Sequence, residues 1–460
     1  MKKLFFVVVL FLCVFKFTIG TSQELPLIKI SENNRYLITK AGTPFFWLGD
    51  TAWELFHRLN LQESEKYIQN RADKGFTVIQ AVILAELDGL TIPNANRDLP
   101  LIDQNPATPN EAYLEHVDKV IEFANKNGIY IGLLPTWGDK FNKKWGVGPE
   151  IFTPENAAVF AAFLAKRYQS KNVIWILGGD RNPEENEDLE ITKAMARAIR
   201  KIVGKKQLIT YHPQGGSSSA DFFGDEDWLD FTIFQSGHSD TYTQNYKQTQ
   251  KEYSKEKIRP VIDGEPCYED HPVYWKAENG WFNEFHTRRA GYWSMLAGAC
   301  GHTYGNHNVW QMWRPGRDPI SAARTPWQQA LDYPGAYQAG YMKKLFESRP
   351  WQRLVPYQQM IEKGPNHGGG DILASIASDQ SFAMLYFPFG SNAEIDLSVI
   401  SGTQKRAWWF NPRIGTVIDV GIIKNNKSQV LDPPADEQEG NDWVFVIDDY
   451  SKYKKLLSDE

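Results

Sequence analysis

Val173-Ile174-Trp175-Ile176-Leu177-Gly178-Gly179-Asp180 is the stretch that decides the fold of this chain. Its apolar residues, many of them β-branched, are typical of a strand buried on both faces of a parallel sheet. The two glycines allow a sharp backbone turn where that strand ends. We therefore expect Asp180 at the rim of the sheet, the place where α/β barrels carry their active sites. The alternative is that Asp180 only caps the following helix.

A second stretch of the same kind ends in another acid. Arg259-Pro260-Val261-Ile262-Asp263-Gly264-Glu265 is again a short apolar strand followed by glycine and a carboxylate. Because the pattern occurs twice, it favours a functional pair of acids, Asp180 and Glu265, over two independent helix caps.

Strand-like and helical segments alternate between residues 24 and 350. Apolar runs predict eight strands, at 44–53, 77–83, 129–135, 173–180, 208–211, 231–235, 259–265 and 299–304. Helix patterns separate most of them, at 60–74, 111–127, 189–203, 244–255 and 283–296, and a further helix begins at Thr153-Pro154. This alternation predicts right-handed βαβ units and an α/β fold, a closed (β/α)8 TIM barrel.

The pattern changes after residue 350. Short alternating runs at 382–387, 393–399, 406–410, 417–420 and 443–447 are separated by Gly, Pro, Asn and Asp. Such spacing is typical of a small antiparallel β-sandwich, which we place at 355–460. The polar, proline-containing segment 432–441 is expected to be a loop.

The first twenty residues have the features of a secretory signal peptide. Lys2 and Lys3 precede an apolar run that is too short to span a bilayer, and small residues follow near Gly20. We therefore expect a protein that is exported across the inner membrane, remains in the periplasm and does not insert into the membrane after cleavage.

Charge and cysteine content narrow the class of partner. Removing a leader with three lysines and no acid changes the formal net charge from −6 to −9, which argues against nucleic acid and anionic membranes as partners. Only Cys267 and Cys300 then remain, so one disulfide is possible but a cysteine-stapled scaffold is not. The 16 Trp and 20 Tyr favour a carbohydrate as the ligand, because aromatic faces stack on sugar rings.

Glycoside hydrolysis needs one acid to protonate the leaving oxygen and one carboxylate to attack or to activate water. We interpret Asp180 as the acid/base and Glu265 as the nucleophile. Asp263 and Glu269 are rivals to Glu265, although alternation along the strand places Asp263 one step deeper. The alternative is that both acids are ion-paired, for example with Arg181.

Other polar and aromatic residues are expected at the same rim. The candidates for substrate binding are Trp47, Asp50, Trp137, His212, Gln235, His238 and Tyr304, and the long polar loop 86–110 is a candidate substrate-facing segment. Trp53 and Trp310 are further stacking candidates. The histidines, with His302 and His307, suggest a metal site, but the first strand lacks the His-x-His pair common in barrel metallohydrolases. We therefore predict no cofactor.

Three motifs resemble glycoside hydrolase family 140. They are Phe46-Trp47-Leu48-Gly49-Asp50-Thr51-Ala52-Trp53, Trp175-Ile176-Leu177-Gly178-Gly179-Asp180 and Asp263-Gly264-Glu265-Pro266. The segment Trp408-Trp409-Phe410-Asn411-Pro412-Arg413-Ile414-Gly415 resembles the collagen-binding-type domain that accompanies this family. The resemblance implies an apiosidase-like enzyme that acts on side chains of the plant pectin rhamnogalacturonan II. It also implies that Asp180 is the acid/base and Glu265 the nucleophile.

The sequence thus predicts an exported, retaining exo-glycosidase whose partner is a plant cell-wall oligosaccharide, with an apioside as the favoured substrate. Two alternatives stay open: a glycosidase that cuts another plant glycan, and a non-catalytic carbohydrate-binding or adhesion protein. The oligomeric state is not predicted.

Overall fold

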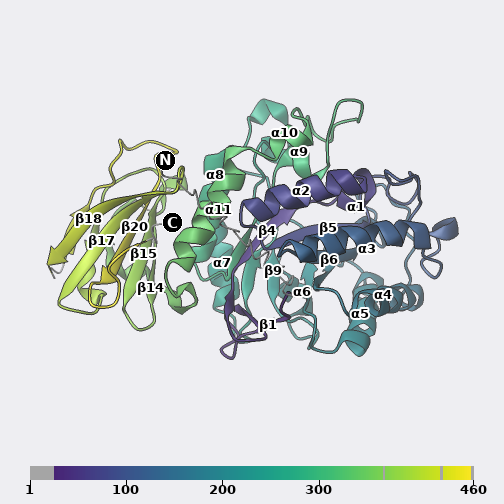
Figure 1. Cartoon of the computed structure of the whole chain (residues 1–460), viewed down its shortest axis with the longest axis horizontal. Helices are drawn as coiled ribbons and strands as arrows, with labels where there is room; N and C mark the ends of the chain where they lie inside the picture. Colours follow the sequence, from purple (N-terminus) through teal and green to yellow (C-terminus); the bar gives the residue numbers. More distant parts are fainter. Residues whose placement is uncertain (1–24, 366–367, 425–427, 457–460) are drawn as a thin grey trace, which may run out of the picture.

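The computed structural model describes residues 25–365, 368–424 and 428–456. The expected signal peptide at 1–20 lies outside the described residues. The described chain forms a barrel and a smaller all-β domain beside it, shown in yellow-green in Figure 1. The predicted fold class, an α/β barrel followed by an antiparallel β domain, is confirmed.

Eight parallel strands form the barrel sheet. They are β4 (Trp47–Thr51), β5 (Val78–Leu84), β6 (Tyr130–Thr136), β7 (Val173–Gly178), β8 (Ile209–His212), β9 (Thr232–Phe234), β10 (Val261–Asp263) and β11 (Gly301–Tyr304). Ladders join them in the order β8-β7-β6-β5-β4-β11-β10-β9. Between β8 and β9 the Thr210 hydroxyl donates to the Phe231 carbonyl at 2.7 Å, and this side-chain hydrogen bond helps to close the ring.

Helices surround this sheet and alternate with its strands. They are α1 (Leu55–Arg58), α2 (Leu61–Asp73), α3 (Glu111–Lys126), α4 (Pro154–Tyr168), α5 (Asn186–Val203), α6 (Ser219–Phe223), α7 (Asn245–Tyr253) and α8 (Glu284–Leu296), followed by α9 (His307–Trp310), α10 (Trp327–Ala330) and α11 (Pro334–Glu347). The amphipathic pattern explains their placement. In α5, for example, Ile191, Met195, Ile199 and Val203 recur every four residues and are buried.

Short strands at the start of the chain form a separate antiparallel sheet. They are β1 (Ile28–Ile30), β2 (Leu37–Thr39) and β3 (Pro44–Phe45). The Tyr130 hydroxyl, at the amino-terminal end of β6, donates to the Pro26 carbonyl. The hairpin therefore lies at the amino-terminal ends of the barrel strands, opposite to the end where Asp180 and Glu265 are found.

The C-terminal domain contains two antiparallel sheets. The larger has the order β12 (Leu354–Pro356), β14 (Leu373–Ala377), β15 (Phe382–Phe387), β20 (Trp443–Asp449), β17 (Gln404–Asn411) and β18 (Thr416–Lys424). The smaller consists of β13 (Ile361–Lys363), β16 (Ala393–Asp396) and β19 (Ser428–Leu431). All five predicted runs contain strands, and 432–441 is a loop.

The central strands of the larger sheet, such as β15 and β20, are buried on both faces. Along β15, Met384 and Tyr386 belong to an apolar cluster that also contains barrel residues such as Trp293 of α8. The alternating residues Leu385 and Phe387 pack in a second cluster shared with the smaller sheet. Figure 1 shows α8 and α11 between the barrel and this domain. The C-terminal domain therefore covers apolar surface of the barrel.

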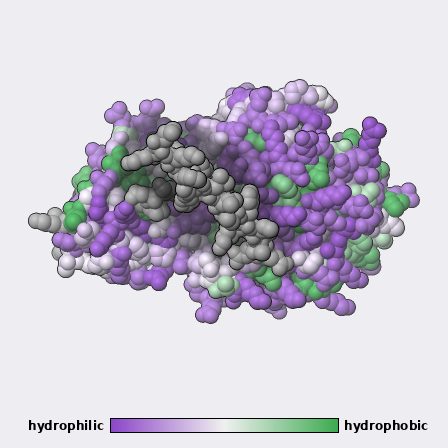
Figure 2. Space-filling model, viewed as in Figure 1, coloured by the Kyte–Doolittle hydropathy of each residue, from purple (hydrophilic) through white to green (hydrophobic). Residues whose placement is uncertain are grey.

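The surface seen in Figure 2 is mostly hydrophilic, with apolar residues scattered in small groups. Within the described ranges, no helix combines the length and the apolarity needed to cross a bilayer. Cys267 and Cys300 are both buried and both carry free thiols, so the disulfide that the sequence left open is not formed.

A buried ion pair joins the two domains and gives a prediction for stability. The Arg288 guanidinium of α8 donates to both carboxylate oxygens of Asp442 at 2.6 and 2.7 Å, and the Tyr386 hydroxyl also donates to Asp442. Arg288→Ala leaves the buried carboxylate without its cation, so we expect it to destabilise the protein by about 3–5 kcal/mol. The measurement is the midpoint of urea unfolding.

The exposed pair formed by Lys363 and Glu394, at 2.7 Å, provides the matched control for Arg288→Ala. Solvent screens this pair, so Lys363→Ala should cost less than about 1 kcal/mol. Equal effects of the two substitutions would show that the contact between the domains adds little to stability.

Candidate active site

A cavity of about 760 Å³ opens at the carboxyl ends of the barrel strands. Loops that follow several different strands contribute its aromatic, amide and carboxyl side chains. Its lining includes Trp53, Glu86, Leu87, Trp137, Trp145, Asp180, Gln214, Gln235, His238, Glu265, Tyr268, Tyr274, Trp275 and Trp310. This end of an α/β barrel is where such folds place their active sites.

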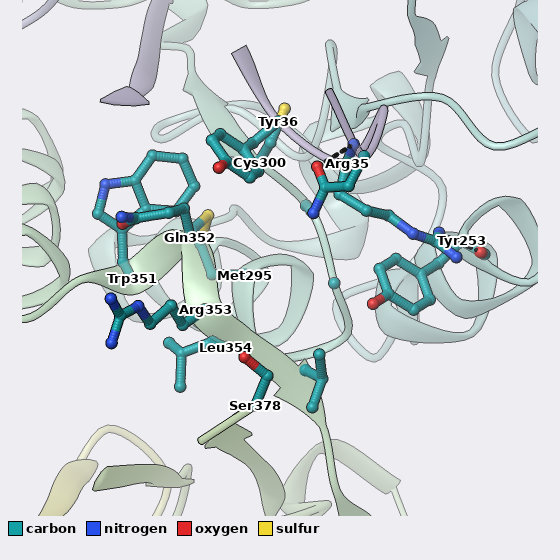
Figure 3. Close-up of a pocket in the computed structure, with 14 residues that line it drawn as sticks. Arg35, Tyr36, Tyr253, Met295, Cys300, Trp351, Gln352, Arg353, Leu354 and Ser378 are labelled. Carbon is teal, nitrogen blue, oxygen red and sulfur yellow. Dashed lines mark hydrogen bonds between the residues drawn. The ribbon is translucent and has the colours of Figure 1, made fainter. Parts of the chain in front are cut away.

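A second cavity, of about 370 Å³, lies at the other end of the barrel, where the amino-terminal hairpin meets the C-terminal domain (Figure 3). Arg35 and Tyr36 come from the hairpin, Cys300 precedes β11, and Trp351 and Arg353 follow α11. Among the described residues that line this cavity, none carries a carboxyl group. It therefore lacks the two acids that glycoside hydrolysis requires.

The turn after β7 places Asp180 in the first cavity. Gly178 and Gly179 have φ angles of 86° and 115°, and Asp180 itself has a φ of 50°. A Cβ on Gly178 would lie 2.6 Å from the His212 carbonyl oxygen, and one on Gly179 would lie 2.8 Å from the Trp137 ring. Only glycine fits at both positions. A non-glycine residue in the left-handed region is a form of backbone strain that clusters at functional sites.

Glu265 reaches the cavity from the seventh strand. Gly264 precedes it, and a Cβ there would lie 2.5 Å from the Ile233 side chain, so glycine allows the close passage of this backbone. His238 Nε2 lies 3.1 Å from Glu265 Oε1, and His212 Nε2 lies 2.9 Å from Oε2. One imidazole therefore faces each oxygen of the carboxylate.

The protonation of His212 follows from its other ring nitrogen. The backbone N–H of Asp180 donates to His212 Nδ1 at 3.2 Å. Because Nδ1 accepts a hydrogen bond, the neutral ring carries its proton on Nε2, the atom that faces Glu265. His212 thus connects the backbone of one acid to the carboxylate of the other. The Trp53 ring packs against His212, with centroids 5.3 Å apart, and holds it in place.

The surroundings shift the pKa values of the two acids in opposite directions. Burial, together with the nearby charge of Glu265, raises the pKa of Asp180 to about 7. Burial also acts to raise the pKa of Glu265, but hydrogen bonds from His212 and His238 outweigh it and lower the value to about 2. Asp180 can thus hold a proton while Glu265 remains a carboxylate. Opposite shifts of this kind separate an acid from a nucleophile or base.

The rival carboxylates are bonded into the protein framework. Asp263 accepts hydrogen bonds from the Ser236 hydroxyl at 2.7 Å and the Asn245 amide at 3.0 Å. Glu269 accepts from the Tyr304 hydroxyl at 2.5 Å and the Gly335 backbone N–H at 3.1 Å. Neither Asp263 nor Glu269 lines the cavity. Their protein donors give both a structural role.

Six of the predicted site residues besides the two acids line the cavity or contact its acids, and three of the predicted residues do not. Trp137, Gln235 and His238 line the cavity, and His212 lies behind it against Glu265. Trp53 and Trp310, expected as stacking residues, also line it. The three that lie elsewhere are Trp47, Asp50 and Tyr304.

The direction of each side chain explains why those three lie outside the cavity. Trp47 points into the barrel interior, where its Nε1 donates to the Thr303 hydroxyl at 3.1 Å. Asp50 has the opposite parity on β4, faces α2 and pairs with Arg71 at 2.6 Å. The Tyr304 hydroxyl donates to Glu269. The expectation that these three contact substrate is therefore not supported by their positions.

Sequence reasoning missed several polar residues of the cavity, among them Glu86, Gln214 and Tyr268. Glu86, the first residue of the polar loop 86–110, lines it, and burial together with the charge of Asp180 raises the pKa of Glu86 well above the usual range. Tyr268 packs on His238 with ring centroids 4.4 Å apart, and burial raises the pKa of its phenol strongly. Gln214 also lines the cavity. The only feature of the sequence that could have indicated these residues is that each of them follows a predicted barrel strand.

The remaining histidines have protein partners or lie in the barrel interior. His307 Nε2 lies 3.0 Å from the Ile320 carbonyl and 2.9 Å from that of Ser321, and burial lowers the pKa of His307 to about 4. His302 is buried on β11. In the part of the chain that the structure describes, no three His, Cys, Asp or Glu side chains are grouped so that they could hold a metal ion.

The barrel and the C-terminal domain match two different family models. Residues 31–353 match the apiosidase-like catalytic domain. Residues 355–448 match a domain described as the putative collagen-binding domain of a collagenase. A comparison with curated proteins found no match.

Two solved structures resemble the whole chain. One, described as a glycoside hydrolase, is 31% identical, has a TM-score of 0.86, and aligns over 94% of this chain and 98% of its own. The other, described as a glycoside hydrolase family 5 protein from Bacteroides vulgatus, has the same identity and TM-score over 94% and 95%. Together with the family match and the paired acids, they show that this chain belongs to the apiosidase-like family and that its barrel is the catalytic domain of a glycoside hydrolase.

Proposed function

We propose that this enzyme releases apiose from the side chains of rhamnogalacturonan II, acting from the chain end and with retention of anomeric configuration. The observation that carries the proposal is the pair formed by Asp180 and Glu265, with opposite pKa shifts, in the cavity of an apiosidase-like catalytic domain. The family match supports the sugar, and the cavity supports the reaction.

In this mechanism Glu265 attacks the anomeric carbon while Asp180 donates its proton to the oxygen of the departing sugar. The glycosidic bond breaks, and a covalent ester joins the sugar to Glu265. Asp180, now a carboxylate, takes a proton from water, which attacks the same carbon and restores Glu265. His238 forms a hydrogen bond with one oxygen of Glu265 and His212 Nε2 lies 2.9 Å from the other, so both imidazoles orient the carboxylate before the attack.

The shape of the site supports action at a chain end. The barrel interior directly below the acids is filled, since the Gln80 amide donates to the Gly264 carbonyl at 2.9 Å from the opposite wall. Trp53 and Trp137 line the cavity and pack on each other with centroids 5.0 Å apart. In this proposal one terminal sugar binds beside these rings and the two acids, and the remaining saccharide lies toward the cavity mouth.

The site of action is proposed from the amino-terminal sequence. The basic and then apolar leader at 1–20 supports export and a periplasmic enzyme that meets plant cell-wall oligosaccharides. Edman sequencing of protein recovered from the periplasmic fraction tests this, because a mature chain should begin near Thr21. A full-length chain in the cytosol would contradict export.

Chromatography of the products released from pectin fractions tests the substrate. Apiose should appear as a free monosaccharide from rhamnogalacturonan II oligosaccharides, while a panel of aryl glycosides reports on other sugars. Release of another sugar from another plant glycan would replace the apioside assignment and leave glycoside hydrolysis in place. Release of internal oligosaccharides would contradict action at a chain end.

Proton NMR of the first-formed product tests the stereochemistry. Retention places the new hydroxyl on the face from which the leaving group departed, through the intermediate on Glu265. An inverted first product would make Glu265 the base that activates water.

The pH dependence of hydrolysis gives a further prediction. Asp180 must be protonated to donate, and its raised pKa of about 7 means that the active form is present below that pH and is lost above it. Glu265, with a pKa of about 2, stays ionised through the acidic range. We therefore expect kcat/KM to fall as the pH rises past about 7. The measurement is kcat/KM across the acidic, neutral and alkaline range.

Glu86 provides the control for this assignment, because its pKa is also raised. Glu86→Gln should leave the alkaline decline in place. A decline that disappears in Glu86→Gln, or that persists in Asp180→Asn with an activated substrate, would assign the acid to another group.

A further inference from the structure

Three exposed aromatic side chains stand at the mouth of the catalytic cavity. Trp145, Tyr274 and Trp275 all line it, and their exposed fractions are 57%, 60% and 48%. Large aromatic side chains are usually buried, and an exposed group of them beside an active site indicates a surface that binds a ligand or a partner molecule. The mechanism proposed above uses none of the three.

The rings come from opposite sides of the barrel. Trp145 lies between β6, the third barrel strand, and α4. Tyr274 and Trp275 follow β10, the seventh strand. In a closed ring of eight strands, the third and seventh face each other across the mouth. A ligand that leaves the cavity therefore passes between these two walls.

The backbone holds Tyr274 and Trp275 in an unfavourable conformation. Their φ angles are 53° and 62°, in the left-handed region that residues with a Cβ avoid. The Tyr274 N–H donates to the His238 carbonyl at 2.8 Å, and the Ser321 hydroxyl donates to the Trp275 carbonyl at 2.5 Å. Neighbours that fix two adjacent strained residues are typical of ligand clamps.

Each wall is also connected to a catalytic group. The Trp275 ring packs edge-on against His271 at 4.4 Å, and His271 stacks on His238 at 4.3 Å. On the other side, the Arg181 guanidinium lies over the Trp145 ring at 4.3 Å from its centroid. Arg181 is buried and directly follows Asp180. The Trp145 and Trp275 rings are therefore held from behind, while much of each remains exposed.

We propose that Trp145, Tyr274 and Trp275 form an aromatic clamp that binds the sugar rings of the leaving group. Flat aromatic faces pack on the C–H surfaces of sugars and leave the hydroxyls to water. The clamp indicates that the substrate is an oligosaccharide that extends beyond the scissile bond. This inference rests on the proposed hydrolysis from a chain end, which places the released sugar in the depth and the leaving group at the mouth.

The test compares two substrates of the same released sugar. One is a pectin-derived oligosaccharide, and the other is the glycosyl fluoride, whose leaving group has no ring to stack. For Trp145→Ala, Tyr274→Ala and Trp275→Ala, kcat/KM on the oligosaccharide should fall about tenfold more than kcat/KM on the fluoride, the factor that a stacked ring of ~1.4 kcal/mol gives. Tyr337→Ala removes an exposed tyrosine of α11 that does not line the cavity and provides the matched control.

Tyr274→Gly separates binding from folding. Glycine accepts the left-handed backbone without strain, so the thermal midpoint should stay the same or rise while turnover of the oligosaccharide falls. A structural role for Tyr274 would instead lower the midpoint together with turnover.

Three results would overturn the clamp. They are equal losses on both substrates, no loss in any of the three alanine variants, and a wild-type enzyme that cleaves the fluoride but no oligosaccharide. Failure of the apioside assignment is distinct, because the product screen then reveals another sugar. The same comparison, made with the fluoride and the oligosaccharide of that sugar, then tests whether the three aromatic residues bind the leaving group.

Discussion

Replacing Glu265 with glutamine is expected to lower kcat at least about a thousandfold, because the amide cannot form the covalent intermediate and a group acting at the reacting centre contributes on that scale or more. Rates on the natural oligosaccharide and on an activated aryl glycoside should both fall, since the attack of Glu265 accompanies the departure of either leaving group. Steady-state kinetics with both substrates provides the measurement.

The fold of Glu265→Gln should be preserved. The amide oxygen of the new glutamine can accept a hydrogen bond from the Nε2–H of His212. The amide NH2 group then faces His238. His238 can accept there if its proton moves to Nδ1, an atom that is buried without a protein partner. A thermal midpoint close to that of the wild type checks this.

Two outcomes bear on the assignment of Glu265. Near-normal turnover in Glu265→Gln would remove it from the mechanism. In Glu265→Ala, added azide should enter the space left by the carboxylate and restore cleavage of an activated glycoside, giving a glycosyl azide of inverted configuration. Rescue without a glycosyl azide would indicate that Glu265 acts as a base rather than as the nucleophile.

The parts of the site that the sequence predicted best are local in the chain. A buried strand, a glycine and an acid follow one another at Asp180 and at Glu265, and the glycines are required by contacts that a Cβ would make too close. The barrel followed from alternation of the same kind. Segments β15 and β20 were predicted because turn residues bound them on both sides.

The parts that were missed depend on the direction of side chains and on packing between distant segments. Asp50 ends an apolar run as Asp180 does, but its parity on β4 points it at Arg71 on the outer side. Strand β14 is buried on both faces between the two apolar clusters, so it lacks the polar alternation that marks a strand. No spacing reveals that His212 and His238 meet at one carboxylate.

Asp180→Asn is expected to lower kcat/KM on the natural oligosaccharide roughly a thousandfold, because asparagine cannot donate a proton to the leaving oxygen. The substitution should not disturb the fold. Arg181 Nη1 lies 3.6 Å from the carboxylate, but its guanidinium also donates to the carbonyls of Asn142 and Lys143. Arg181 therefore keeps its partners when the acid is lost, and a wild-type thermal midpoint should confirm this.

The decisive feature of Asp180→Asn is its dependence on the leaving group. Fluoride and nitrophenolate leave with little protonation. For substrates that carry them, the rate of the first step should therefore fall by a factor at least about tenfold smaller than the factor for the oligosaccharide. Hydrolysis of the intermediate also needs Asp180, now as the base, so the ester on Glu265 should accumulate with the activated substrate. Mass spectrometry of the quenched enzyme then detects the attached sugar. Equal losses on every substrate, with no attached sugar, would remove Asp180 as the acid and leave Glu86 as the carboxyl in the same cavity to be tested in that role.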